Sequence, residues 1–207
     1  RLSGWVKGLL LFLVVILAIR MALPYAAQWY INRVLSQPGG YQGRVGDVDL
    51  MLWKGSYSLD EIILIQEGGS TERPLFKADS VKFSLLWSAV IKGAVVGNVT
   101  LVRPEINFID SQNDSKDQTG ESENWLNLAD QLFPLQIDKF EIIDGQIKFH
   151  NPDSTPPIDV ALHDINGAAY NLVNSRDLSK DLVARAQFEA QTAEQGTLSF
   201  KSQLNPS

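Results

Sequence analysis

The sequence predicts a mainly β protein that carries one transmembrane helix at its N-terminus. An uninterrupted apolar segment runs from Gly8 to Ile19, close to the start of the chain. The body instead alternates apolar and polar residues, as it does from Asp47 to Leu52, and this alternation is typical of strands with one buried face. A short apolar pattern also recurs along the body. We therefore expect a curved antiparallel sheet or an open β-groove, interrupted by two short helices.

The transmembrane helix is expected to run from about Gly4 to Ala27. The apolar segment alone is short for a hydrocarbon core, which takes about 20 residues, so its flanks must extend it. A cleaved signal peptide is the alternative, but Tyr25-Ala26-Ala27 is a poor match to a cleavage site. Basic and aromatic side chains near both ends are typical of membrane interfaces, and we assign this role to Trp5, Lys7, Arg20, Tyr25, Trp29 and Tyr30. Residues 1–35 then form the anchor and a juxtamembrane helix.

The composition excludes several classes of function. The 207 residues have a formal net charge of -6 and no cluster of Lys or Arg outside the anchor, so nucleic acid is not an expected partner. The absence of cysteine excludes disulfides, thiol nucleophiles and thiolate metal sites. Basic residues are balanced across the anchor, so charge does not orient it. Because the sequence starts at Arg1, we expect residues 36–207 to be a β-domain that is the first part of a longer chain.

Two short helices and one loop are predicted within the β-domain. The segment from Trp87 to Gly93 reads as a helical turn with a glycine stop, and the segment from Trp125 to Phe133 places its apolar residues on one helical face. The stretch 111–124 is polar throughout and has no apolar surface to bury, so it is expected to be a mobile loop.

A degenerate repeat organises the strands at 50–59, 99–108 and 140–149. In each copy the apolar positions change parity near the middle. In the last copy Asp144-Gly145 is a strong hairpin signal, so we predict a two-residue turn that folds 140–149 back on itself. In the middle copy Arg103-Pro104 forbids that turn, and we predict a bulge or bend in an edge strand.

No pattern in the chain indicates catalysis or a cofactor. His150 and His163 lack the spacing and the third ligand of a metal site. The paired carboxylates Asp47 and Asp49 share the polar face of an alternating strand, where charge normally meets water. No nucleophile elbow, phosphate loop or dinucleotide fingerprint occurs. We therefore expect a protein that is not an enzyme and that needs no cofactor.

The segment from Ala78 to Phe108 resembles the opening of AsmA-like bacterial envelope proteins. It contains a strand, a short helix that ends in Lys92-Gly93, a second strand, and then Arg103-Pro104 with alternating apolar residues. The segment from Phe133 to Phe149 is similar to the next unit of that family, whose relatives include TamB-like and YhdP-like proteins. The order of an anchor followed by a β-body matches as well.

The resemblance implies a single-pass protein of the bacterial inner membrane with its body in the periplasm. It also implies a repeating β-groove whose apolar face holds phospholipid acyl chains and contributes to lipid transport or outer-membrane homeostasis. Membrane lipids, and other envelope proteins, are the partners that this family likeness implies. A domain of this length would form only the membrane-proximal start of a bridge.

Two functions stay open for the apolar faces of the strands. They line a lipid groove, or they form an ordinary core or docking surface of an anchored scaffold subunit in an envelope complex with no lipid cargo. Alternation is the same in both cases, so the sequence does not separate them. The candidate groove-lining residues are Val81, Phe83, Leu85, Val99, Leu101, Ile106, Phe108, Phe140, Ile142, Ile147 and Phe149.

Overall fold

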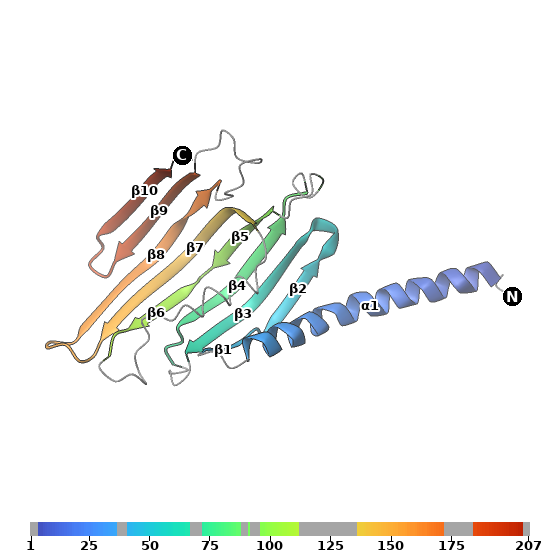
Figure 1. The fold of residues 1–207 in the computed structure, drawn as a ribbon, viewed down its shortest axis with the longest axis horizontal. Coiled ribbons are helices and arrows are strands. Elements are labelled where there is room, and N and C mark those ends of the chain that lie inside the picture. Colours follow the sequence, from blue (N-terminus) through green and yellow to red (C-terminus); the bar gives the residue numbers. More distant parts are fainter. Residues whose placement is uncertain are drawn as a thin grey trace.

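The part of the chain that the structure describes folds into one long helix followed by a single broad β-sheet (Figure 1). The computed structural model describes residues 4–36, 41–66, 72–87, 91, 96–111, 136–171 and 184–204. Within these ranges the mainly β character and the N-terminal apolar helix are confirmed.

Helix α1 comprises Gly4–Leu35 and is long and apolar enough to cross a membrane. Its residues from Gly4 to Leu23 are all exposed, so its apolar surface is not used for packing within the chain. Pro24 lies inside the helix, where its missing N–H leaves one carbonyl of the preceding turn without its helical donor. Only the last turns of α1 lie against the sheet, and Leu35 is buried there.

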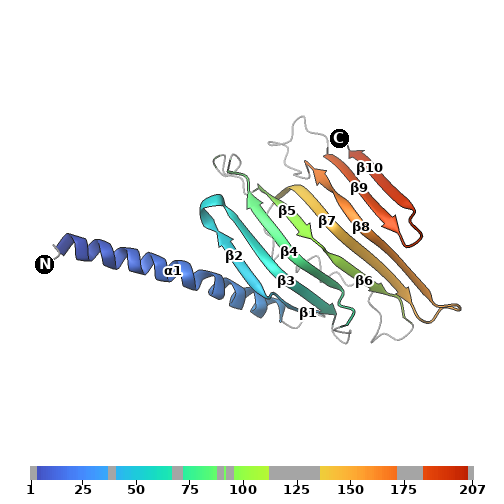
Figure 2. The same cartoon turned by 180° about the vertical axis from the view of Figure 1, so that it is seen from behind.

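Within the described residues ten strands form the sheet, and Figures 1 and 2 show it from its two faces. Along the main path the strands follow the order β1-β3-β4-β5-β7-β8-β9-β10, while β2 pairs with β3, and β6 pairs with β4 and β7. The strands are β1 (Tyr41–Arg44), β2 (Asp47–Met51), β3 (Ser56–Gln66), β4 (Phe76–Leu85), β5 (Val96–Val102), β6 (Glu105–Ile109), β7 (Gln136–Asn151), β8 (Ile158–Tyr170), β9 (Ala184–Thr192) and β10 (Thr197–Leu204), with a 3-10 turn η1 (Leu52–Lys54) between β2 and β3.

The sheet is mixed, so the prediction of an antiparallel sheet is wrong at one place. β7 pairs in parallel with both β5 and β6, whereas the other neighbours are antiparallel. Parallel neighbours need a crossover connection, and the chain between β6 and β7 is long enough to supply one. Alternation alone is the same in both kinds of pairing, so it did not indicate this crossover.

The two predicted short helices are not among the described elements. The segment 125–133 and nearly all of the predicted loop 111–124 lie outside the described residues. Of the segment 87–93, Trp87 and Ile91 are described, and the Ile91 amide donates to the Trp87 carbonyl at 3.0 Å, as in one helical turn.

The predicted hairpin at Asp144-Gly145 is wrong, because β7 continues through both residues as one strand. Asp144 has a left-handed backbone with φ of 56°, and the pairing of β7 with β8 shifts register on both sides of Gly145. The parity change therefore marks a β-bulge and not a turn. At Arg103, with φ of 47°, the predicted bend is found, but between β5 and β6 in the interior of the sheet and not at an edge.

The bulge at Asp144 and the bend at Arg103 lie side by side, and left-handed residues of other strands continue this crease across the sheet. The Arg103 amide donates to the Ile143 carbonyl, and the Gln146 amide donates to the Pro104 carbonyl, both at 2.8 Å. Left-handed residues also occur at Glu61 in β3 and at Asp164 in β8. We call the five residues of this crease the bulge line: Glu61, Asp79, Arg103, Asp144 and Asp164, of which Asp79 of β4 bonds the Arg103 guanidinium.

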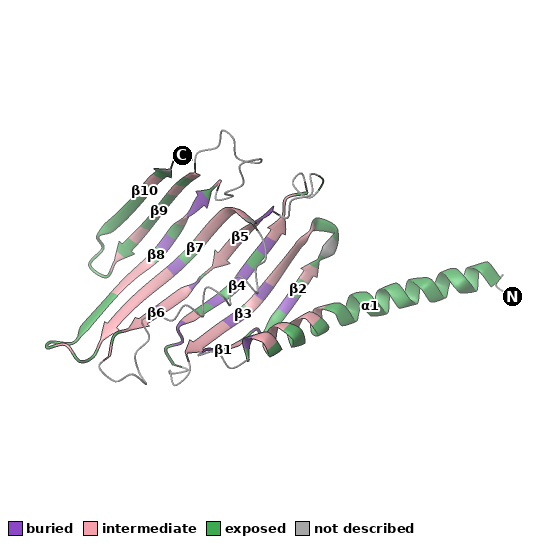
Figure 3. Ribbon diagram, in the orientation of Figure 1, coloured by how far each residue is buried: buried purple, intermediate pink, exposed green. Residues whose placement is uncertain are grey.

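The hydrophobic core lies where the end of α1 covers the sheet. Buried residues concentrate on the strands nearest the helix, whereas β10 is largely exposed (Figure 3). The buried core cluster is Leu35, Val45, Val48, Leu59, Ile62, Ala78, Val81, Phe83 and Val99. Asn32 links the helix to the chain just beyond β1, because its side chain accepts from the Val45 amide at 2.6 Å and donates to the Val45 carbonyl at 3.1 Å.

Candidate functional site

The two faces of the sheet differ in chemistry, and one of them is apolar from β2 to β10. Directly paired residues of neighbouring strands point to the same face, so the register identifies which side chains share it. A continuous file of apolar residues and one glycine crosses the sheet on this face, and we call it the apolar row: Val48, Leu59, Val81, Leu101, Ile142, Gly167, Phe188 and Phe200.

Exposure rises along the apolar row with distance from α1. Val48, Leu59 and Val81 are each only 2 % exposed, the middle of the row is half-buried, and Phe200 at its far end is 58 % exposed. The same face is thus a packed core beside the helix and a partly open apolar surface on the later strands. A contiguous exposed apolar surface of this kind is typical of a protein, membrane or ligand interaction site.

The structure brings the candidate groove-lining residues onto this one face. They divide by burial into two groups. Val81, Phe83 and Val99 are buried in the core cluster, so they do not offer surface to a ligand in this conformation. The other candidates are half-buried: Leu85, Leu101, Ile106, Phe108, Phe140, Ile142, Ile147 and Phe149.

The last two copies of the repeat lie next to each other in parallel and in register. Val99 pairs with Phe140 and Leu101 with Ile142 before the bulge line, and beyond it Ile106 pairs with Ile147. Phe108 and Phe149 complete the ladder. The two copies therefore place apolar side chains of the same kind next to each other. The bend at Arg103 in one copy lies beside the bulge at Asp144 in the other.

Sequence reasoning missed the most exposed part of the apolar face. Val160 pairs directly with Phe149, and Phe200 with Phe188, so β8 to β10 extend the face beyond the predicted residues. The alternation of β9 and β10 was the signal for this extension, although many of its inward positions are alanine or serine. Large side chains exposed by more than two fifths on this part are Ile158, Val160, Leu198 and Phe200.

The opposite face is polar and held together by ion pairs between strands. Glu105 of β6 accepts from Lys77 of β4 at 3.1 Å and from Lys148 of β7 at 2.9 Å. Burial raises the pKa of the Glu105 carboxyl, but hydrogen bonds from Lys148, Asn107 and Lys77 lower it more, so the pKa lies below its usual value. This asymmetry orients the sheet, because only the other face can be removed from water at low cost.

An aromatic pair anchors the packed end of the apolar face. The rings of Tyr57 and Phe83 stack with centroids 4.6 Å apart. Burial raises the pKa of Tyr57 to about 12, so its phenol is neutral at physiological pH.

The predicted membrane-interface residues all lie on α1, but at different places relative to the sheet. Trp5 and Lys7 lie on the part of the helix that projects away from the sheet, and Trp5 is 93 % exposed. Arg20 lies over the ring of Trp53. The exposed aromatic side chains near the sheet are Tyr25, Trp29 and Tyr30, and their interfacial role stays a prediction.

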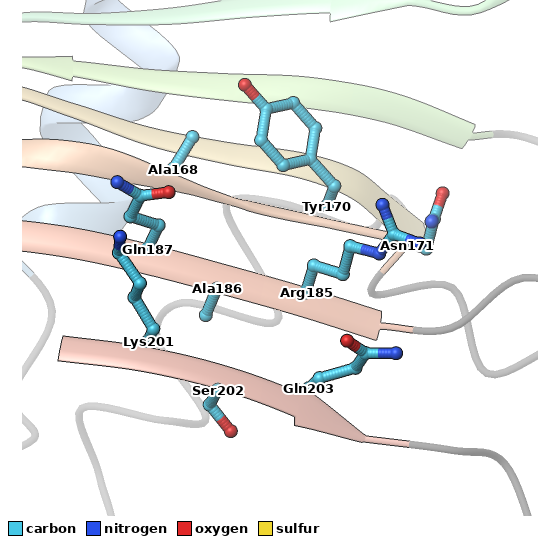
Figure 4. Close-up of a pocket in the computed structure, with 9 residues that line it drawn as sticks. All are labelled: Ala168, Tyr170, Asn171, Arg185, Ala186, Gln187, Lys201, Ser202 and Gln203. Carbon is cyan, nitrogen blue, oxygen red and sulfur yellow. The ribbon is translucent and has the colours of Figure 1, made fainter.

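Two hollows among the described residues are lined mainly by residues with polar or charged side chains. The larger, of about 630 Å³, lies at the ends of β8, β9 and β10, where Tyr170, Arg185, Gln187 and Lys201 extend to the same side (Figure 4). The smaller lies on the polar face around Glu105 and Lys148. Neither has the apolar lining that an acyl chain would need, so the candidate ligand surface is the open apolar face.

The titratable groups of the described chain do not form a catalytic or metal-binding arrangement. His163 lies 3.0 Å from Asp164, and His150 lies 3.6 Å from Asp159, each as an isolated pair. Within the described ranges no three His, Asp or Glu side chains gather as metal ligands.

Comparison with known proteins adds no assignment, since no family model and no curated protein matches this chain.

Proposed function

We propose that this protein is an inner-membrane-anchored periplasmic protein of the AsmA-like type that binds phospholipid acyl chains on the apolar face of its sheet. In this proposal it contributes to lipid transport or to outer-membrane homeostasis and is not an enzyme. The observation that carries the proposal is the apolar row, whose exposure rises from 2 % at Val48 to 58 % at Phe200 on one face of a single sheet.

Three features support a lipid as the occupant of this face. Helix α1 would hold the sheet at the surface of a bilayer, where acyl chains are at hand. The apolar face presents aliphatic and aromatic side chains without a fixed polar partner for a specific small molecule. The polar face carries the ion pairs of Glu105 with Lys77 and Lys148, so in this proposal water contacts that face and lipid covers the other.

The alternative, an anchored scaffold subunit of an envelope complex, is favoured by one observation. β10 ends the sheet within the described part of the chain, and its Leu198 and Phe200 are exposed by 51 % and 58 %. An edge strand with exposed apolar side chains is a template for pairing with another chain. On this alternative a protein and not a lipid covers the far end of the apolar face.

Site-specific photocrosslinking separates the two functions. Benzoylphenylalanine replaces Phe200 on the apolar face or, as the matched control, the adjacent Lys201 on the opposite face. After illumination of cells, mass spectrometry should find phospholipid adducts at position 200 and none at position 201.

Protein adducts at position 200 without lipid adducts would favour the scaffold. Equal lipid adducts at both positions would show nonspecific contact with a bilayer and would contradict lipid binding by one face. Because both substitutions are at exposed positions of the same strand, neither should unfold the sheet.

A further inference from the structure

A cluster of exposed apolar side chains at one end of the sheet is not explained by the apolar face. It consists of Met51, Trp53, Trp87 and Ile91, which we call the apolar tip, and these side chains are exposed by 36 %, 63 %, 50 % and 85 %. Large exposed aromatic and aliphatic side chains that gather at one point of a surface mark an interaction site.

The apolar tip is assembled from two segments that are distant in sequence. Gly55 turns the chain out of η1 with φ of +62°, and the Trp87 ring packs so closely on it that a Cβ at position 55 would lie 2.9 Å from Cζ2 of Trp87. The Trp87 indole N–H donates to the Lys54 carbonyl at 3.3 Å. The turn between β2 and β3 and the end of β4 are thereby held together as one projecting unit.

A second contact links the apolar tip to α1. The Arg20 guanidinium lies 4.6 Å from the centre of the Trp53 ring, a cation-π contact. The tip therefore sits beside α1 at the level of Arg20. Figure 1 shows that the N-terminal half of α1 extends away from the sheet at this same end.

The level of Arg20 places the tip in the membrane, provided that α1 crosses it as proposed above. The apolar stretch of α1 continues to Ala27, which is seven residues beyond Arg20, or about 10 Å along a helix that rises about 1.5 Å per residue. Side chains that lie on a bilayer surface enter it by about 5–10 Å, which is the same depth. A span that ends near Ala27 therefore carries the tip into the boundary between headgroups and acyl chains.

We propose that the apolar tip is a second membrane contact, which inserts into the interface of the bilayer that holds α1 of the same molecule. Its composition fits this partner, because tryptophan is enriched at membrane interfaces and the basic groups beside it, Arg20 and Lys54, suit lipid phosphates. The acids of the hairpin, Asp47 and Asp49, lie further along β2, away from η1. The contact would fix the tilt of the sheet relative to the bilayer at a second point besides α1.

Spin-label depth measurements on the full chain test this proposal. The chain has no native cysteine, so single variants Met51→Cys and Ile91→Cys can each carry one nitroxide while both tip tryptophans remain. The protein is reconstituted in nanodiscs of phosphatidylethanolamine and phosphatidylglycerol. Two references complete the set: Leu11→Cys within the span, and Glu194→Cys in the turn between β9 and β10, at the opposite end of the sheet.

The measured quantity is the ratio of a label's collision rate with oxygen to its collision rate with a water-soluble nickel chelate. This ratio should be several times higher for both tip labels than for the label at Glu194. If the tip labels match Glu194 while Leu11 reports the bilayer, the tip proposal is overturned and the anchor stands. If Leu11 also reports water, anchor and tip fail together. Labels shielded from both reagents would show a protein partner on the tip and would equally overturn the proposal.

Discussion

Asn32 shows how a single side chain can join a membrane helix to a sheet. Its amide both accepts from the Val45 amide at 2.6 Å and donates to the Val45 carbonyl at 3.1 Å, so it replaces a β-ladder partner for a residue just beyond β1. Val45 is 3 % exposed, and a buried backbone without such a partner would lose its hydrogen bonds to water with no replacement. Gln28, one helical turn earlier, donates to the Gly46 carbonyl and so adds a second side-chain link between α1 and this segment.

Replacing Asn32 by alanine should weaken the attachment of α1 to the chain beyond β1 and so lower the stability of the protein. Asn32→Ala removes the side-chain oxygen to which the buried Val45 N–H donates, and it leaves the Val45 carbonyl to the Gln28 amide at 3.4 Å. We therefore expect a loss of about 1–3 kcal/mol in the free energy of unfolding. The measurement is urea unfolding of the full chain in detergent, followed by circular dichroism at a wavelength sensitive to strands. Arg33→Ala is the control, since Arg33 is exposed beside Trp29, and an equal loss in both variants would contradict a specific role for Asn32.

At the scale of one element, β7 shows why a strand can need a left-handed residue. Apolar side chains must stay on one face on both sides of Asp144, although the number of residues between Ile142 and Ile147 does not fit a regular alternation. The bulge at Asp144 absorbs the misfit. Gly145 beside it is buried, and a Cβ there would lie 2.7 Å from Cγ2 of Ile142 and 3.3 Å from Cγ of Pro104.

The backbone of Asp144 makes the bulge sensitive to β-branched residues. Asp144→Val should destabilise the sheet by about 1–2 kcal/mol relative to Asp144→Gly, because a left-handed conformation costs a side chain with a branched Cβ about that much. Thermal unfolding of the two variants gives the comparison. Asp49→Val in β2, an exposed strand position, should be neutral or stabilising relative to Asp49→Gly, and a matching loss there would show that the effect does not depend on the left-handed backbone.

The sequence was sufficient for the helix and for the positions of most strands, because these depend on local patterns. It also revealed the repeat whose second and third copies pair in register. The parity change at Asp144-Gly145 was interpreted wrongly, since a hairpin and a bulge both switch the apolar face and only the pairing partners distinguish them. Parallel pairing of β7 and the apolar tip depend on contacts between distant segments, which alternation does not encode.

On the scale of the whole molecule, the sheet is not uniformly packed. Its core lies beside the end of α1. Beyond β5, β8 keeps Ile165, Ala168 and Ala169 buried, β9 alternates half-buried and exposed residues, and β10 is largely exposed. A single sheet that is packed at one side and open at the other has few apolar contacts to hold its far strands in place. Local stability should therefore follow the same gradient.

Amide hydrogen exchange should reveal this gradient in the purified protein. We expect the slowest exchange in β3 and β4 and the fastest in β10, although both regions have antiparallel ladder partners. Mass spectrometry of peptic fragments resolves the strands. Addition of phospholipid should slow exchange in β8 to β10 more than in β3 and β4 if acyl chains cover the far end of the apolar row, and uniform exchange without lipid would contradict the gradient itself.

The bulge line also bears on how the length of this chain can change over evolutionary time. Gaining or losing one residue within a strand normally inverts every side chain beyond that point, so that apolar groups face water. Here β7 and β8 already absorb such a slip at one level, where their pairing shifts register beside the left-handed residues Asp144 and Asp164. Insertions and deletions of single residues should therefore accumulate at this level and be rare elsewhere in the strands. Related chains would differ in length at the crease and still keep one apolar and one polar face.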